Sequence, residues 1–298
     1  MANVTWVQRI KLCIDIARRL DYLHSTTDYK QTLIHRDMRS DNILLGDNFK
    51  AKIANFGLSK FHPCGDKRST TYETVIAGTY VYLDPEYMMT CKLKAEMDLY
   101  SFGVVLFEIL TGRLAYASVY TKEKEEGPAP IVRQHFKRGT LKELVDPELK
   151  KERVEKNFTS TEGLNEDSLH TFYEIGYRCL VEQQAQCPSI KYVIHELYRA
   201  LYFQEFPNSL HIPFEDIRRA TGDFSLTNLI GIRGFGRAYR GEMSLNDEPS
   251  HIIAKRNDAG LGQGEDEFFT EIEILFEYKH ENVISLLGYY KKRKMRES

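Results

Sequence analysis

The side chains best suited to chemistry lie in an octapeptide, residues 35–42, with the sequence His-Arg-Asp-Met-Arg-Ser-Asp-Asn. A carboxylate such as Asp37 can accept the proton of an attacking hydroxyl group. The amide oxygen of Asn42, five residues later, can bind magnesium. These residue types could support proton transfer beside a bound magnesium ion, whereas the plainer alternative is a surface loop of ordinary polar residues.

A glycine-rich stretch lies towards the C-terminus, where Gly231, Gly234 and Gly236 occur in the sequence Gly-Ile-Arg-Gly-Phe-Gly. Glycines allow backbone N–H groups to approach a phosphate closely because no Cβ stands in the way. Such a stretch is weak evidence by itself, since a tight hairpin has the same composition.

Composition excludes several classes of protein. The 298 residues include 41 Lys and Arg against 43 Asp and Glu, and the formal net charge of −2 excludes nucleic-acid binding through bulk charge. Hydrophobic residues make up 42% and aromatic residues 12%, which is enough for a packed core. The five cysteines include no Cys-x-x-Cys pair, and no apolar stretch approaches the ~18 residues of a membrane-spanning helix. The sequence therefore predicts a soluble chain without a disulfide framework, a zinc site or a membrane span.

Helices and short strands are predicted to position the octapeptide. Apolar residues at spacings of three and four predict a helix over residues 5–24, with Thr5 and Gln8 as a capping box. A strongly apolar helix is predicted over residues 97–111, ended by Gly112. The other elements predicted in this part are strands at 32–34, 43–45 and 50–54, an exposed polar loop at 62–74, and helices at 131–145, 168–182 and 188–203.

The sequence pattern changes after about residue 204. A short helix at 213–221 precedes strands at 229–231, 238–243 and 252–255, a helix at about 265–278 and a strand at 283–288. The sequence therefore predicts an α+β fold in three parts: a mainly α-helical part over 1–203, a linker with a short helix over 204–222, and a β-rich part over 223–298.

Four elements in the same order make the first part resemble a protein kinase. The octapeptide matches the catalytic loop H-R-D-x-x-x-x-N, residues 55–57 (Asn-Phe-Gly) fall where D-F-G stands, and residues 83–86 (Leu-Asp-Pro-Glu) fall where A-P-E stands. Asp98 opens the apolar helix, as does the family's aspartate that holds the backbone of the catalytic loop. Four segments are similar in sequence to plant receptor-like kinases of the FERONIA type, which are specific for Ser and Thr: residues 34–37, 78–80, 82–87 and 100–106.

The second part resembles the beginning of a kinase small lobe. The glycine-rich stretch falls in the place of the loop over ATP, and residues 223–224 and 280–289 again look like the plant family. Lys255 follows Gly236 by 19 residues and Glu271 follows Lys255 by 16, which matches the pair that holds the α- and β-phosphates. An ordinary exposed ion pair, worth at most about 1 kcal/mol, is the alternative.

The order of the two parts is the reverse of that in a kinase. The resemblance implies a protein-kinase-like fold in which the large lobe, residues 1–203, lacks its own small lobe and hinge and is followed by the partial small lobe, residues 223–298, of a second copy. A piece of a tandem kinase explains this order more simply than a circular permutation, which would still need the hinge.

The resemblance also implies ATP and magnesium as cofactors and gives each matching residue a role. Asp37 would be the base, Arg39 a phosphate contact, and Thr79 part of the substrate-facing loop. The remaining roles are magnesium ligands (Asn42, Asn55), ATP contacts (Gly231, Gly234, Gly236, Lys255, Glu271), support of the site (His35, Asp98, Glu86), and activation-loop phosphorylation candidates (Ser69, Thr70, Thr71, Thr74). Each of these last four has the plain alternative of a solvated hydroxyl group.

Several residues depart from the family pattern. Asn55 replaces the D-F-G aspartate with a neutral amide, although magnesium prefers carboxylate oxygen. Glu86 is predicted to lack its usual partner, because Cys187 stands where the family has an arginine. The other departures are Arg39 for a lysine and Val81 and Arg233 for glycines.

Three functional interpretations remain open. The first is ATP-dependent phosphoryl transfer to Ser or Thr of proteins, impaired in this chain. The second is a pseudokinase that acts as a binding or scaffold module in receptor-like kinase signalling. The third is an incomplete gene product with an unpaired sheet edge. The resemblance implies a protein substrate or partner kinase, association with membrane receptor kinases, no nucleic acid, and a cytoplasmic location that extends to the inner face of the plasma membrane.

Overall fold

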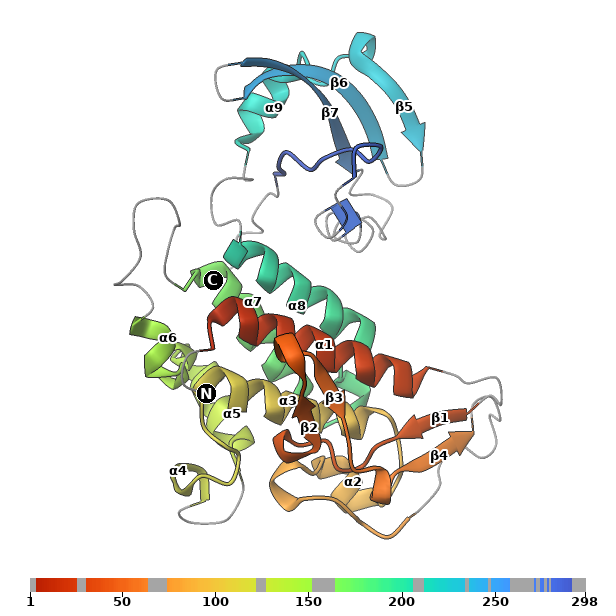
Figure 1. Cartoon of the computed structure of the whole chain (residues 1–298), viewed down its shortest axis with the longest axis vertical. Helices are drawn as coiled ribbons and strands as arrows, with labels where there is room; N and C mark the ends of the chain where they lie inside the picture. The colour runs from red at the N-terminus through yellow and green to blue at the C-terminus, as the bar shows by residue number, and fades with distance from the viewer. Residues whose placement is uncertain are drawn as a thin grey trace. The chain divides into compact units, whose positions relative to one another are not determined.

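The computed structural model describes residues 4–25, 31–63, 74–121, 127–151, 164–205, 212–233, 236–245 and 248–257, and parts of 271–290. They belong to two compact units, Met1–Glu205 and Phe206–Ser298 (Figure 1). Helices and small antiparallel sheets occur together, so the predicted α+β, kinase-like class is confirmed.

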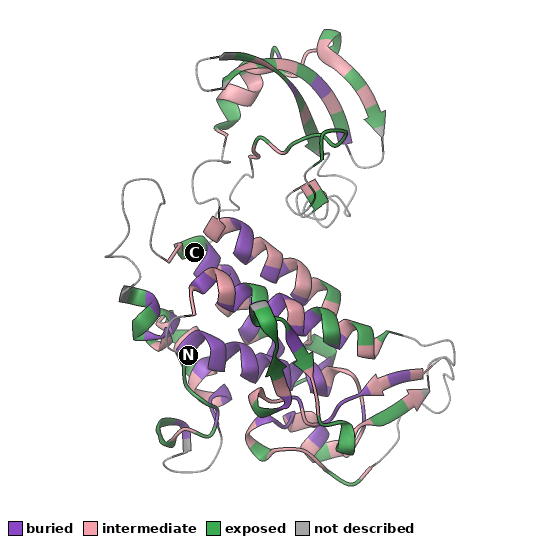
Figure 2. Cartoon of the chain, viewed as in Figure 1, coloured by how far each residue is buried: buried purple, intermediate pink, exposed green. Residues whose placement is uncertain are grey.

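The core of the first unit is built around two helices that the sequence predicts correctly. α1 (Trp6–His24) begins with the predicted capping box, in which Thr5 and Gln8 each accept a hydrogen bond from the backbone of the other. α3 (Glu96–Thr111) is buried from its second residue to its last and ends at Gly112, whose φ of +66° favours glycine (Figure 2). A helix that is apolar on all sides belongs in a core, and α3 occupies that place.

Six further helices of the described part surround this core. α8 (Ile190–Glu205) packs against α1 and α7 (Glu166–Cys179), and α3 also packs against α7. The predicted helix over 131–145 is shorter, because α5 (Ala129–Arg138) ends where Gly139 adopts a φ of +69°. The remaining helices of the described part are α2 (Pro85–Thr90), α4 (Ser118–Thr121) and α6 (Pro147–Lys151).

Two small sheets fix the ends of the octapeptide. β1 (Gln31–Ile34) pairs antiparallel with β4 (Lys60–Pro63), and β2 (Ile43–Leu45) pairs antiparallel with β3 (Ala51–Ile53). The octapeptide therefore leaves one sheet at β1 and enters the other at β2. The sequence predicts β1, β2 and β3 but not β4, whose last residues fall in the predicted polar loop. Most of that loop, residues 64–73, lies outside the described residues.

The second unit contains α9 (Phe214–Ala220) and a three-stranded antiparallel sheet of β5 (Leu229–Arg233), β6 (Gly236–Leu245) and β7 (Glu248–Asn257) in sequence order. Tyr239 of β6 is buried, and its ring meets that of Phe224 edge-on at 5.3 Å between centroids. These strands are longer than predicted but lie at the predicted places.

The predicted strand over 283–288 is wrong. Residues 281–283 form a turn, and residues 284–288 have no strand partner. The backbone pair nearby joins the Ile212 N–H to the Tyr289 carbonyl at 3.1 Å, and Ile284 is 64% exposed. The predicted helix over 265–278 lies mostly outside the described residues, and Glu271, Ile274 and Leu275 within it are helical. Across the parts of both units that the structure describes, no helix is long and apolar enough to cross a bilayer.

Candidate active site

A buried aspartate fixes the start of the octapeptide. Asp98, in the first turn of α3, has no solvent exposure. Its carboxylate accepts hydrogen bonds from the backbone N–H groups of His35 and Arg36 at 2.7 and 2.8 Å, and from Nε2 of His24 at 2.9 Å. The His35 ring is also buried, and its Nε2 donates to the Ala54 carbonyl at 3.0 Å. These bonds hold residues 35–36 against the core.

Arg36 is a positioning residue that the sequence analysis did not single out. Its backbone has a φ of +71°, and its side chain is buried. The guanidinium donates to the Leu58 and Val75 carbonyls at 3.2 and 2.7 Å, and to the Tyr87 hydroxyl at 2.8 Å. One side chain thus ties the octapeptide to three later segments.

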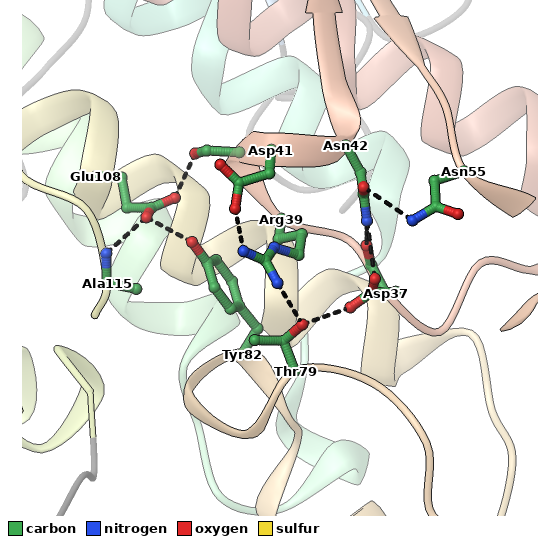
Figure 3. A network of polar contacts seen from close by, with 10 residues as sticks. Asp37, Arg39, Asp41, Asn42, Asn55, Thr79, Tyr82, Glu108 and Ala115 are labelled. Carbon is green, nitrogen blue, oxygen red and sulfur yellow. Dashed lines mark hydrogen bonds and ion pairs between the residues drawn. The ribbon is translucent and has the colours of Figure 1, made fainter. Parts of the chain in front are cut away.

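Asp37 receives a hydrogen bond on each carboxylate oxygen (Figure 3). The Asn42 side-chain amide donates to Oδ2 at 2.9 Å and to the Asp37 backbone carbonyl at 2.7 Å. The Thr79 hydroxyl donates to Oδ1 at 2.8 Å. Asp37, Asn42 and Thr79 were all predicted as site residues, and the structure brings them together. A carboxylate held in this way is oriented to accept a proton from a hydroxyl group.

Arg39 extends the same network. Its guanidinium donates to the Thr79 hydroxyl at 2.8 Å, forms an ion pair with Asp41, and lies over the Tyr82 ring at 5.8 Å from the centroid. Partial burial opposes the charge of Arg39, but the hydrogen bond and charge of Asp41, together with Tyr82 and Asp37, outweigh it and raise the pKa of Arg39. In this structure the Arg39 guanidinium thus binds protein groups, and one of them is the Thr79 hydroxyl that donates to Asp37.

The other side of the octapeptide is closed by two amides. Asn55 follows β3 and has left-handed backbone, with φ of +66°. Its side-chain amide donates to Oδ1 of Asn42 at 3.1 Å. Asn42 is 7% exposed, so the oxygen that was predicted to bind magnesium is buried and already accepts a hydrogen bond.

The donor set does not fit magnesium. Magnesium is bound in proteins mainly through carboxylates and water, and both predicted ligands, Asn42 and Asn55, are neutral amides. Among the described residues, no group of three or more His, Cys, Asp and Glu side chains could hold a metal ion. Kinases of the family use ATP and magnesium. In this chain, however, the Asn55 amide donates a hydrogen bond to Oδ1 of Asn42, the atom that was predicted to bind the metal.

Glu108 is a second buried acidic residue that contacts the octapeptide, through Ser40. It was not predicted as a site residue. It is 4% exposed and accepts hydrogen bonds from the Tyr82 hydroxyl at 2.5 Å, the Ala115 N–H at 2.6 Å, and the Ser40 hydroxyl (Figure 3). Burial raises the pKa of Glu108, and the three hydrogen bonds offset this in part. The available signal was a single acidic residue interrupting an apolar helix.

Glu86 lacks the arginine that is its usual partner in the family, as predicted, but it has other partners. Its carboxylate accepts from the Gln184 N–H at 2.8 Å and pairs with Nζ of Lys94 at 3.3 Å. The hydrogen bond from Gln184 leads the effects that lower the pKa of Glu86. A backbone group and a nearby lysine thus replace the arginine whose place Cys187 takes.

The remaining predicted residues belong to other segments of the first unit, to the second unit, or to the residues outside the described part. Thr74 lies in the first unit, where its N–H donates to the Cys91 carbonyl at 3.0 Å. Lys255 of β7 and Glu271 form the expected ion pair in the second unit, and both side chains are partly exposed. Gly231 lies in β5 and Gly236 begins β6. Ser69, Thr70, Thr71 and Gly234 lie outside the described residues.

Comparison with known proteins agrees with this geometry. The profile of the family described as protein tyrosine and serine/threonine kinase matches residues 1–197. The receptor-like protein kinases HERK 1, FERONIA and THESEUS 1 of Arabidopsis thaliana are each 38% identical to the chain, over 205, 203 and 210 residues respectively. These matches cover 69%, 68% and 70% of this chain, and 23%, 21% and 23% of the relatives. The chain thus spans less than a quarter of the length of these relatives, and it belongs to the family of protein tyrosine and serine/threonine kinases.

Proposed function

We propose that this chain is a kinase-like module that binds a serine- or threonine-bearing segment of a protein and transfers phosphate to it weakly or not at all. The observation that carries the proposal is the contrast around Asp37. The carboxylate is oriented by Asn42 and Thr79, whereas an amide donor, Asn55, stands where the family has a carboxylate.

The oriented base supports binding of a hydroxyl acceptor. Both oxygens of Asp37 accept hydrogen bonds from uncharged donors, and Arg39 holds Thr79 from the other side. A serine or threonine hydroxyl is one of the acceptors that the family description names, beside tyrosine. The substrate would be a protein segment or a partner kinase.

The amide pair supports impaired transfer. Replacing a carboxylate by an amide removes one negative charge where phosphoryl transfer requires magnesium. A loss of about 3 kcal/mol of transition-state stabilisation lowers a rate by about two orders of magnitude. ATP would be bound through Gly231, Gly234, Gly236, Lys255 and Glu271.

Residues 1–203 would be the large lobe of one kinase copy, 204–222 a linker, and 223–298 the partial small lobe of a second copy. This proposed tandem arrangement would give the chain a scaffold role beside receptor-like kinases at the inner face of the plasma membrane. Phosphorylation of Ser69, Thr70, Thr71 or Thr74 would add negative charge to the large lobe.

Intact mass of the purified chain after incubation with ATP and magnesium tests the proposal, with dephosphorylated casein as a general acceptor. We expect at most a trace of added phosphate on either protein from the wild type, and none from Asp37→Ala. Stoichiometric phosphate added by the wild type but not by Asp37→Ala would instead establish the second candidate function, a working kinase, which the orientation of Asp37 favours. Transfer that survives Asp37→Ala would remove the role proposed for Asp37.

A further inference from the structure

We propose that the side-chain amide of Asn55 takes the place of a divalent cation, so that the octapeptide is held in shape without metal. This inference rests on the proposed function, because it concerns the same site. It goes further because it gives Asn55 a structural role, whereas the sequence predicts only a weakened metal ligand at this position. The site would therefore bind a hydroxyl-bearing protein segment, and this binding would need no metal ion.

The orientation of the Asn42 amide follows from its partners. Its side chain faces two acceptors, the Asp37 carboxylate at 2.9 Å and the Asp37 carbonyl at 2.7 Å, and the two hydrogens of one NH2 group can serve both. The NH2 group of Asn42 must therefore face Asp37, because an amide oxygen cannot donate to either. Its oxygen Oδ1 then faces away from Asp37, towards Asn55.

The orientation of Asn55 follows in turn. Its side chain lies 3.1 Å from Oδ1 of Asn42, an acceptor with no hydrogen to give, so Asn55 must present its NH2 group. The hydrogen bonds run from Asn55 to Asn42 to Asp37, and from Arg39 through Thr79 to Asp37. Two chains of donors thus converge on one carboxylate.

An aspartate at position 55 could not close this chain. An ionised carboxylate only accepts hydrogen bonds, so one of its oxygens would face Oδ1 of the largely buried Asn42. Two oxygens in contact require a cation or a proton between them. Asparagine supplies the hydrogen itself, and like aspartate it tolerates the left-handed backbone found at position 55.

The metal response of thermal unfolding tests this inference on the full chain. Trp6 is the single tryptophan of the sequence and is buried in α1, so its fluorescence reports unfolding of the first unit alone. Wild type, Asn55→Asp and Asn55→Ala are each melted in EDTA and in rising MnCl2 at constant ionic strength, without nucleotide. Asn55→Ala is the matched control, because it removes the amide without adding an oxygen.

We expect the wild type to melt at the same temperature in EDTA and in Mn²⁺. Asn55→Asp, which shares the tolerance of asparagine for this backbone, should melt below the wild type in EDTA and recover with Mn²⁺, by about 2–4 °C at five times its dissociation constant. Asn55→Ala should not respond to the metal. A wild-type melting temperature that rises with Mn²⁺ as that of Asn55→Asp does would overturn the inference. So would an Asn55→Asp variant that melts no lower than the wild type in EDTA and ignores the metal.

Failure of this inference and failure of the proposed function are distinguishable. Phosphate transfer is read by mass in the presence of ATP, whereas the metal response is read by melting without nucleotide. Added phosphate on a chain that shows no metal response in melting would contradict the function and leave the role of Asn55 standing. A metal-responsive wild type that adds no phosphate would do the reverse.

Discussion

The two sides of the octapeptide are built from different kinds of interaction. On the base side, donors from Asn42 and Thr79 converge on the charged carboxylate of Asp37. On the amide side, Asn55 donates one hydrogen bond to Asn42, and neither amide is charged. Hydrogen bonds to a charged group are stronger than hydrogen bonds between neutral groups, so the interactions on the base side are the stronger of the two sets. The orientation of Asp37 can therefore persist although Asn55 replaces the aspartate of the family pattern.

Removal of the common anchor should have the largest effect, because it affects both sides at once. Asp98→Ala leaves the N–H groups of His35 and Arg36 buried without their acceptor. We expect the free energy of unfolding of the first unit to fall by about 3–5 kcal/mol. Urea unfolding followed by Trp6 fluorescence measures it. A loss below about 1 kcal/mol would show that the octapeptide does not depend on α3.

Thr79→Val isolates the base side. Valine has the shape of threonine but neither donates to Asp37 nor accepts from Arg39. We expect a loss of about 1–3 kcal/mol in unfolding free energy, and Thr79→Ser should restore most of it because the hydroxyl returns. Equal losses in the two variants would mean that packing of the methyl group, and not the hydroxyl, holds this side.

Glu108→Gln tests the buried support beneath both sides through pH. The pKa of Glu108 is raised in the folded chain, so the folded state binds more protons than the unfolded state above the ordinary glutamate value. This contribution to stability is present at low pH and is lost as pH rises towards the raised pKa, by at most about 1.4 kcal/mol per pH unit. Unfolding free energies of Glu108→Gln measured across this window should lack that slope. A variant as steep as the wild type would contradict it.

Lys94→Met should have the smallest effect, because it removes one partner of Glu86 and leaves the Gln184 N–H in place. At neutral pH we expect a loss below about 1 kcal/mol, since the pair is partly exposed. The pKa of Glu86 is lowered, so its contribution is present above the ordinary glutamate value and is lost as pH falls through the lowered pKa. Urea unfolding at neutral and acidic pH measures both effects, and a loss that grows on acidification would contradict the assignment.

The sequence predicts what depends on local pattern. The spacing of apolar residues predicts α1 and α3, and Gly112 predicts where α3 ends, because each of these features depends on residues close in the chain. The octapeptide was predicted for the same reason, since Asp37 and Asn42 lie only five positions apart.

The missed features depend on contacts between distant residues. Arg36 reaches Tyr87 across 51 positions, and Glu86 meets Gln184 across 98. Neither partner could be read from local spacing, and the replacement of the family's arginine by Gln184 and Lys94 gives no sequence signal of its own. Glu108 was visible as an acidic residue in an apolar helix, but its partners Ser40 and Tyr82 come from other segments.

The most direct test of the central claim observes the two amides themselves. NMR of the full chain with ¹⁵N-labelled asparagine resolves the side-chain NH2 signals, and Asn42→Ala and Asn55→Ala assign those of Asn42 and Asn55. The account predicts that Mn²⁺ leaves both signals of the wild type as sharp as those of other asparagines. Selective, saturable broadening of these two signals by Mn²⁺ would place a metal ion between the amides and contradict it.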